Sequence, residues 1–253
     1  MALSKRMLIF LTLLSCMLWS QPSIAQETKS PITVTPIYPK NQNQTVRGYF
    51  DLNVTPKQHQ TIKISIKNNQ DKDLTLKSEV TNAYSNPSGG IMYESSYQSK
   101  DSQLLPEAFT MTQYLQVAPS ITVPAKKTVE LPITISVPEK AVGTLLGGVR
   151  ITLEGKTQKQ QQTTTQGKEA QFIIKTQNAY VIAVQLDTPT SSQPSFSLGD
   201  SEFDPEKTAV LTTMTNHAPL IQKDIRGSYQ VNDSNGNVLF KGSLGPFNMA
   251  PQS

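Results

Sequence analysis

The chain is poor in the residues that most often carry enzyme chemistry: its 253 residues include two histidines, one cysteine and one tryptophan. The cysteine, Cys16, lies in an apolar run near the amino terminus, so the remainder has no thiol, disulfide or cysteine metal site. No later apolar stretch is long enough to span a bilayer. The net charge is +4, and +2 without Lys5 and Arg6. This near-neutral balance does not suggest a nucleic-acid partner.

Motifs of catalytic or cofactor sites are also missing. The sequence contains no Gly-x-Ser-x-Gly elbow, no His-Glu-x-x-His pair and no phosphate-cradling glycine loop. His59 and His217 each lie in a polar or turn context. An acidic cluster lacks the spacing of a calcium loop and reads as a solvated turn; it comprises Asp200, Glu202, Asp204 and Glu206. We therefore expect a protein that is not an enzyme and has no catalytic residue, metal site or cofactor.

The amino terminus has the three parts of a secretory signal peptide over residues 1–25. Lys5 and Arg6 form the basic region, residues 7–19 the apolar region, and Ser23-Ile24-Ala25 a cleavage site before Gln26. A lipoprotein site at Cys16 is the alternative, but the residues around it fit that pattern poorly. An exported chain without disulfides favours a Gram-positive bacterium.

Period-two alternation dominates the rest of the chain and predicts antiparallel sheets with one buried face. Short strands separated by Pro, Gly, Asn and Ser favour an all-β protein of two tandem immunoglobulin-like antiparallel β-sandwich domains. Pro132 lies within the longest alternating segment, so its strand is expected to lie at the edge of a sheet or to contain a bulge. A short helical turn is expected within residues 104–114. The predicted core of the first sandwich comprises Ile62, Ile64, Ile66, Leu131, Ile133, Ile135, Val149 and Ile151.

A polar, low-complexity tract over residues 156–168 divides the chain. It is either a linker or the tip of a long hairpin, and we expect its Gln/Thr-rich part from Gln158 to Gln166 to be mobile and dispensable. With it as a linker, the first domain covers 31–155 and the second 169–253. In the second, residues 210–214 form a probable strand. Asn235-Gly236 predicts a hairpin turn, because both turn positions tolerate positive φ.

The best candidate site is the turn-rich segment between residues 82 and 97. Its asparagines offer hydrogen-bond donors and acceptors, and its tyrosines offer amphipathic faces to sugar rings or peptide. The alternative is a well-capped β-turn with tyrosines packed on the rim of the sandwich. The candidate residues are Asn82, Tyr84, Asn86, Tyr93 and Tyr97.

Three segments in order carry a family resemblance. They are YFDLNVTP at 49–56, NAYSNPSGGIMY at 82–93 and GTLLGGVRI at 143–151. Together they resemble the first domain of the WxL-interacting proteins, surface proteins of Gram-positive bacteria. The resemblance implies a peptidoglycan-binding first domain and a second domain credited with host binding. Implied partners are peptidoglycan, WxL-domain surface proteins and host extracellular-matrix proteins. A membrane anchor is expected in the family but absent from this chain, and the second domain is expected to be incomplete.

We therefore expect a non-catalytic scaffold or adhesion protein of the cell wall. Two other classes stay open. One is a chaperone-like donor of β-edges to secreted subunits, since sandwiches leave exposed edges. The other is a cell-wall-processing enzyme, which the fold alone does not exclude.

Overall fold

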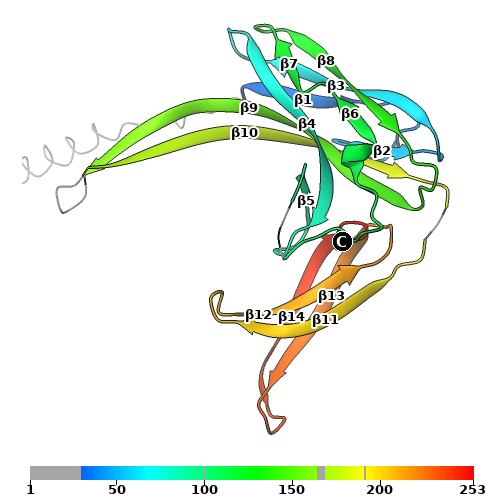
Figure 1. Cartoon of the computed structure of the whole chain (residues 1–253), viewed down its shortest axis with the longest axis vertical. Coiled ribbons are helices and arrows are strands. Elements are labelled where there is room, and N and C mark those ends of the chain that lie inside the picture. The colour runs from blue at the N-terminus through cyan, green and yellow to red at the C-terminus, as the bar shows by residue number, and fades with distance from the viewer. Residues whose placement is uncertain (1–29, 98, 100, 164–168, 191) are drawn as a thin grey trace, which may run out of the picture. The chain divides into compact units, whose positions relative to one another are not determined.

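The computed structural model describes residues 30–97, 99, 101–163, 169–190 and 192–253. Within these residues the protein is all-β, as predicted, and its only helical element is the 3-10 helix η1 (Met111–Gln113) (Figure 1). No helix among them is long and apolar enough to cross a membrane. The predicted signal peptide lies outside the described residues.

Two sheets build the first sandwich. The first has the order β1-β3-β8-β6, with every neighbouring pair antiparallel. Its strands are β1 (Ile32–Ile37), β3 (His59–Asn68), β8 (Thr128–Ser136) and β6 (Leu115–Val117). The alternation of isoleucines along β3 and β8 points one side of this sheet inward, because successive residues of a strand face opposite sides.

The second sheet has six strands in the order β2-β10-β9-β4-β5, with β7 paired to β4 beside this path. Only the β2–β10 pair is parallel. The strands are β2 (Phe50–Asn53), β10 (Glu169–Asp187), β9 (Thr144–Thr163), β4 (Leu74–Ser85), β5 (Ile91–Glu94) and β7 (Ser120–Val123).

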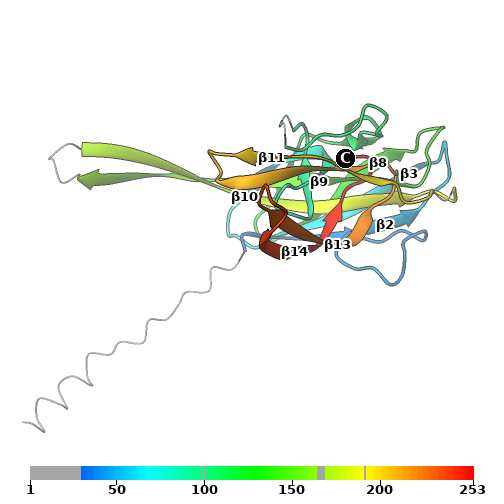
Figure 2. The same cartoon turned by 90° about the horizontal axis from the view of Figure 1, so that it is seen from below.

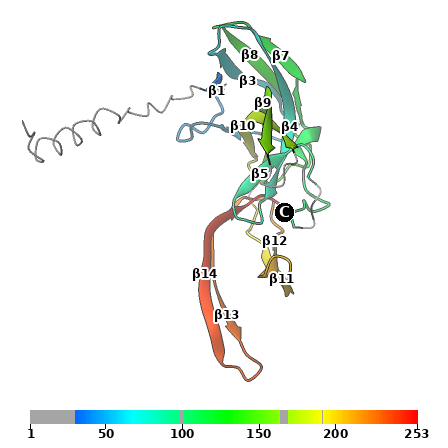
Figure 3. The same ribbon diagram turned by 90° about the vertical axis from the view of Figure 1, so that its left-hand side faces the viewer.

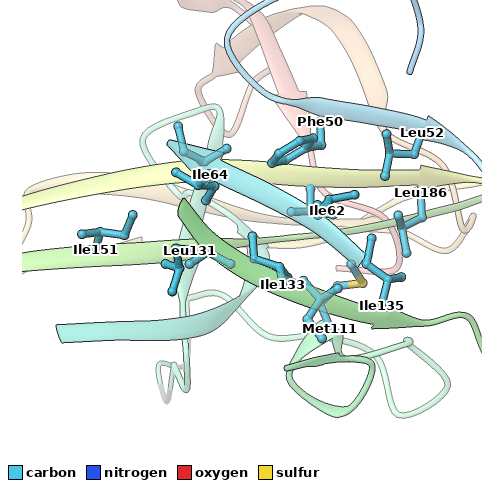
Figure 4. Packing of buried hydrophobic residues seen from close by; sticks show 14 of the residues in the cluster. Phe50, Leu52, Ile62, Ile64, Met111, Leu131, Ile133, Ile135, Ile151 and Leu186 are labelled. Atoms are coloured by element: carbon cyan, nitrogen blue, oxygen red, sulfur yellow. The ribbon is translucent and has the colours of Figure 1, made fainter. Parts of the chain in front are cut away.

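The two sheets enclose one hydrophobic core, to which strands of both contribute (Figure 4). All eight residues predicted from the alternation are buried, at 2% exposure or less, which confirms the inward face. The core also contains residues that the alternation did not single out. They include Phe50, Leu52, Met111, Leu145, Val184 and Leu186.

The polar tract is part of a long hairpin and not a linker. β9 pairs with β10 from Thr144↔Asp187 outward to Thr163↔Glu169 (Figure 2). The inner end of β10 also pairs with β2. Residues 169–187 thus lie in the sheet of the first sandwich, although the linker interpretation placed them in a second domain. Backbone hydrogen bonds can pair the two strands of such a hairpin without any apolar pattern in the side chains. The sequence therefore could not distinguish a hairpin from a linker. Residues 164–168 lie outside the described residues.

Two local expectations need correction. β8 is flanked on both sides and its pairing with β3 runs past Pro132 without a register shift. Pro132 is accommodated because β6 pairs only with residues 133–135, leaving that side of β8 open at the proline. The helical turn within 104–114 is limited to η1, and Pro106 lies in a turn before it.

Four strands form two separate hairpins after β10 (Figure 3). β11 (Phe196–Asp204) pairs with β12 (Ala209–Asn216), and β13 (Gln222–Asn232) with β14 (Val238–Met249). The predicted strand at 210–214 lies within β12. The predicted turn is also present: Gly236 has φ +85°, and the Asp233 carboxylate accepts hydrogen bonds from the backbone of Asn235 and Asn237.

A buried polar junction joins these hairpins to β4. The side-chain amide of Asn216, fully buried, donates to the carbonyls of Leu220 (2.7 Å) and Ala250 (2.8 Å). The Ser85 hydroxyl at the end of β4 lies 2.5 Å from the Ser253 hydroxyl and accepts from the Ala250 N–H. Each of these buried groups is satisfied, so the junction adds specificity without an unpaired polar cost.

Candidate functional site

An open groove of about 660 Å³ lies beside the end of β4. Two of the predicted tyrosines and a loop between β5 and β6 line it. The lining residues are Tyr84, Tyr97, Ser99, Gln103, Leu104, Leu105, Pro106, Ala108, Thr110 and Gln113. The groove thus combines aromatic rings, apolar side chains and neutral hydrogen-bonding groups.

A tight turn between β4 and β5 sets the geometry of this edge. The strands pair from Asn82↔Glu94 to Ser85↔Ile91. In the turn, the Asn86 side chain accepts a hydrogen bond from the Ser88 N–H at 2.9 Å, and Gly89 and Gly90 both have positive φ. Asn86 is therefore used within the turn, as expected for a capped β-turn.

Tyr84 and Tyr97 form the aromatic part of the groove. Their ring centroids are 5.6 Å apart with planes inclined by 53°. Tyr84 is only 6% exposed, whereas Tyr97 is half-buried. Tyr84 consequently supports the ring of Tyr97, which offers the larger accessible face.

The other predicted residues point elsewhere. Asn82 is buried, and its side-chain oxygen accepts from the Thr112 N–H at 3.0 Å, which holds η1 against β4. Tyr93 pairs with Ala83, and because neighbouring residues alternate across a strand it lies on the face opposite Tyr84. Burial, with a smaller effect of Tyr49, raises the pKa of the Tyr93 hydroxyl to about 12. The structure therefore brings only two of the five candidates into the groove.

Most of the groove was not foreseen from the sequence, because it comes from an irregular loop. Two hydrogen bonds fix the loop. The Ser102 hydroxyl donates to the Ser85 carbonyl at 2.6 Å, and the Leu105 N–H donates to the Gln252 carbonyl at 2.9 Å. Neither hydrogen bond corresponds to a periodic pattern in the sequence from which the loop could have been predicted. The nearest sequence signal was the helical turn expected around Pro106.

An ion-pair network fastens β5, the strand that leads into the groove loop. Arg150 of β9 forms ion pairs with Glu79 at 3.2 Å and Glu94 at 2.7 Å, and its guanidinium also donates to the Tyr93 carbonyl. The Arg150 side chain is only 19% exposed, so water screens these pairs less than it does surface pairs.

A second polar cluster lies at the other edge of the same sheet. Burial raises the pKa of the Asp51 carboxyl, and Asp187 beside it acts in the same direction, while a hydrogen bond from Asn43 opposes them. Asp187 itself accepts hydrogen bonds from Thr144 at 2.6 Å and Gln185 at 2.7 Å. The Asp51 carboxyl therefore gains its proton at a higher pH than an isolated aspartate does, beside an Asp187 whose oxygens already accept two hydrogen bonds.

The histidines and the acidic cluster lie away from the groove lining. His59 contacts the Ser136 hydroxyl at 3.1 Å, and His217 contacts that of Ser197 at 2.8 Å, both at the surface. Asp204 caps a turn by accepting from the backbone of Glu206 and Lys207. Among the residues that the structure describes, no three His, Cys, Asp or Glu side chains gather as metal ligands would.

Comparison with solved structures finds distant likenesses. The Csu pilus chaperone–tip adhesin complex of Acinetobacter baumannii gives a TM-score of 0.42 at 11% identity, covering 88% of this chain and 85% of that one. A PapD-like domain of human CEP192 gives 0.34 at 8%, covering 68% and 97%. A family 123 glycoside hydrolase from Clostridium perfringens gives 0.37 at 8%; the match covers 65% of this chain but spans only 28% of the hydrolase. Scores this low say nothing about what the present protein binds.

Comparison with curated proteins returned no match. A family model, in contrast, matches residues 32–153 and is described as "WxL Interacting Protein, peptidoglycan binding domain". The matched range contains all the groove-lining residues and most strands of the first sandwich. It also contains the three segments on which the resemblance was recognised. Over residues 32–153 the chain therefore belongs to the WxL-interacting protein family, whose model describes this part as a peptidoglycan binding domain.

Proposed function

We propose that this protein is a non-catalytic binding protein of the Gram-positive cell wall that holds peptidoglycan in the Tyr84–Tyr97 groove. The observation that carries the proposal is the coincidence of an aromatic, hydrogen-bonding groove with the domain that the family model describes as peptidoglycan binding. The signal peptide expected over residues 1–25 provides the route to the wall.

The chemistry of the groove suits reversible binding to a polymer. Tyr97 offers a ring face, and Gln103 and Gln113 are exposed at the groove with amides that both donate and accept. Water competes for each of these hydrogen bonds, so a single contact contributes only about 0.5–1.5 kcal/mol. We expect modest affinity for one groove and strong retention when many copies meet the repeating wall polymer.

Cosedimentation with purified sacculi, stripped of teichoic acid and protein, tests this function. The wild-type chain should pellet with the sacculi, and Tyr97→Ala should pellet several-fold less. Tyr229→Ala is the matched control, because Tyr229 is 44% exposed but lies on β13. Equal pelleting of the Tyr97 and Tyr229 variants would place the binding site outside this groove.

A second role, in binding a WxL protein, is favoured by the apolar surface of the carboxy-terminal hairpins. Of eleven exposed large apolar residues in the described chain, nine lie between Phe196 and Leu244. Cross-strand pairing sets two of them, Phe203 and Val210, opposite each other, and places the half-buried Val231 opposite the exposed Phe240. Patches of this kind mark protein-binding surfaces in soluble proteins.

We propose that these hairpin faces contact a Trp-x-Leu surface protein, by adding strands to the unpaired edges or by covering the apolar side chains. Pull-down with a purified WxL domain should succeed with the wild-type chain and weaken for Leu198→Ser combined with Phe240→Ser. The Tyr97→Ala variant should bind the WxL domain normally. Capture of collagen or fibronectin in place of the WxL domain would assign the surface to host matrix proteins instead.

A further inference from the structure

The groove has no charged side chain among its ten lining residues. It contains two phenols, two primary amides, two hydroxyls and four apolar side chains, all neutral at physiological pH. A ligand finds no counter-ion among these ten described residues, and an ionised group without a partner is costly to remove from water. The groove is therefore matched to a neutral ligand.

Peptidoglycan offers two chemically different parts to such a site. The stem peptides carry free carboxylate and ammonium groups. The glycan strand consists of N-acetylated amino sugars, and its muramic acid carboxyl is neutralised by amide linkage to the stem. We infer that the groove binds the neutral glycan strand of peptidoglycan and excludes the charged ends of the stem peptides. This inference rests on the proposed function.

The shape and chemistry of the lining fit an acetamido sugar. The face of Tyr97 can stack on the apolar C–H face of a pyranose ring. Leu104, Leu105 and Ala108 supply an apolar surface for the acetyl methyl group. Gln113 and Thr110 present groups that pair with sugar hydroxyls and the acetamide in either direction.

The groove is also held in place before any ligand arrives. Tyr84 lies beneath Tyr97, the Ser102–Ser85 and Leu105–Gln252 hydrogen bonds fix the loop, and η1 is held by Asn82. Because these contacts form without a ligand, binding does not have to order the described part of the loop. A preorganised site loses less conformational entropy on binding. This saving matters for a neutral ligand, because each of its contacts with the groove is weak. A volume of about 660 Å³ in an open groove suits an internal stretch of a polymer, within the ~300–1,000 Å³ of known ligand sites.

Competition for sacculus binding tests the inference. The probes are a synthetic stem tetrapeptide, a tetramer of N-acetylglucosamine, and peptide-free glycan. The peptide-free glycan is prepared with an amidase and then amidated with ammonia, so that each muramic acid carboxyl released by the amidase is neutral again. We expect the peptide-free glycan to displace the protein from sacculi and the tetrapeptide to have no effect at the same concentration. The N-acetylglucosamine tetramer distinguishes general acetamido-sugar binding from a requirement for muramic acid. Binding should change less than about twofold between 50 and 500 mM salt, because no ion pair is involved.

Two variants sharpen the result. Gln113→Ala should lower the affinity for the peptide-free glycan by about 3- to 10-fold, the value of a hydrogen bond. Gln116→Ala, a nearby exposed glutamine that does not line the groove, should leave that affinity unchanged. Displacement by the tetrapeptide but not by the glycan would overturn this inference while leaving peptidoglycan binding intact. Failure of the wild-type chain to bind sacculi at all would instead contradict the proposed function.

Discussion

Gly147 of β9 lies directly against Met111 of η1, so close that a Cβ atom on the glycine would stand 2.5 Å from the Met111 Cβ. The same Cβ would lie 2.4 Å from the Thr81 carbonyl oxygen. Met111 is fully buried, and η1 places Thr110 and Gln113 at the groove. The first glycine of the Gly147-Gly148 pair thus serves the close packing of η1 that shapes one wall of the candidate site.

Gly147→Ala should therefore destabilise the first sandwich and disturb the groove together. Overpacking of this kind costs about 1–3 kcal/mol, which corresponds to a fall in melting temperature of about 3–10 °C. Gly227→Ala is the control, since its Cβ would meet only Leu244 Cδ1, at 3.9 Å. An unchanged melting temperature for Gly147→Ala would show that η1 yields easily and does not define the wall.

Tyr84 and Tyr97 should separate stability from binding. Removing the buried ring of Tyr84 leaves a cavity, so Tyr84→Ala should lose about 3 kcal/mol of unfolding free energy. Tyr97→Ala should lose much less, because its ring is already partly in water. Thermal melts of both variants, read beside their sacculus binding, check this division. Equal destabilisation by both would mean that Tyr97 is a core residue.

The core can be tested at Ile133, which is fully buried and pairs with Ile62 across the sheet. Ile133→Asp should unfold the first sandwich, since the carboxylate would have no partner among the apolar side chains around it. Ile133→Val should cost only about 0.5–1.5 kcal/mol. Circular dichroism melts decide the matter, and a native-like melt for the aspartate variant would refute the assigned inward face.

The raised pKa of Asp51 predicts a pH dependence of stability. The folded protein holds the Asp51 proton more tightly than the unfolded chain does. At low pH the carboxyl is protonated in both states, so it does not lower the unfolding free energy there. Stability is lost as pH rises from the ordinary aspartate pKa of 3.8 through the raised folded value. Asp51→Asn mimics the protonated acid, can still accept from Asn43, and should raise the melting temperature at pH 7 but not at pH 3.

Melting curves of Asp51→Asn and wild type at both pH values make this comparison. Thr75→Ala is a suitable control, because Thr75 is exposed on β4 and far in sequence from both carboxylates. If the asparagine variant were equally destabilised at both pH values, the Asp51 carboxylate would be needed for structure, and a raised pKa would not explain the pH dependence.

The sequence predicted the parts of this fold that depend on side-chain alternation. The stripes containing Ile64, Ile133 and Ile151 identified the core face, and Asn235-Gly236 identified a turn. The end of the polar hairpin and the groove loop were not predictable in the same way. Backbone pairing joins the strands of the hairpin, and the groove loop is held by single hydrogen bonds from the Ser102 hydroxyl to Ser85 and from the Leu105 N–H to Gln252. Neither kind of contact depends on side-chain alternation. Tyr93 does not line the groove, because alternation along the paired strands sends Tyr84 and Tyr93 to opposite faces.

The outer part of the β9–β10 hairpin should be removable. Joining Leu153 to Asn178, which are paired, through an Asn-Gly turn keeps the described buried residues of both strands, Ile151 and Ile182 among them. Because loop entropy varies slowly with length, the unfolding free energy should change by no more than about 1 kcal/mol. A thermal melt of the shortened chain checks this, and a loss of several kcal/mol would show that the outer hairpin contributes to the fold.

The central claim is that the groove beside Tyr97 is where the protein meets the wall glycan. Its most direct test is an NMR titration of isotope-labelled protein with peptide-free glycan strands, following backbone amide shifts. The account predicts that the shifted amides cluster between Tyr97 and Gln113, with the hairpins β11–β12 and β13–β14 unaffected. Shifts confined to those hairpins, or to the sheet face that carries Tyr93, with the Tyr97–Gln113 amides unmoved, would contradict it.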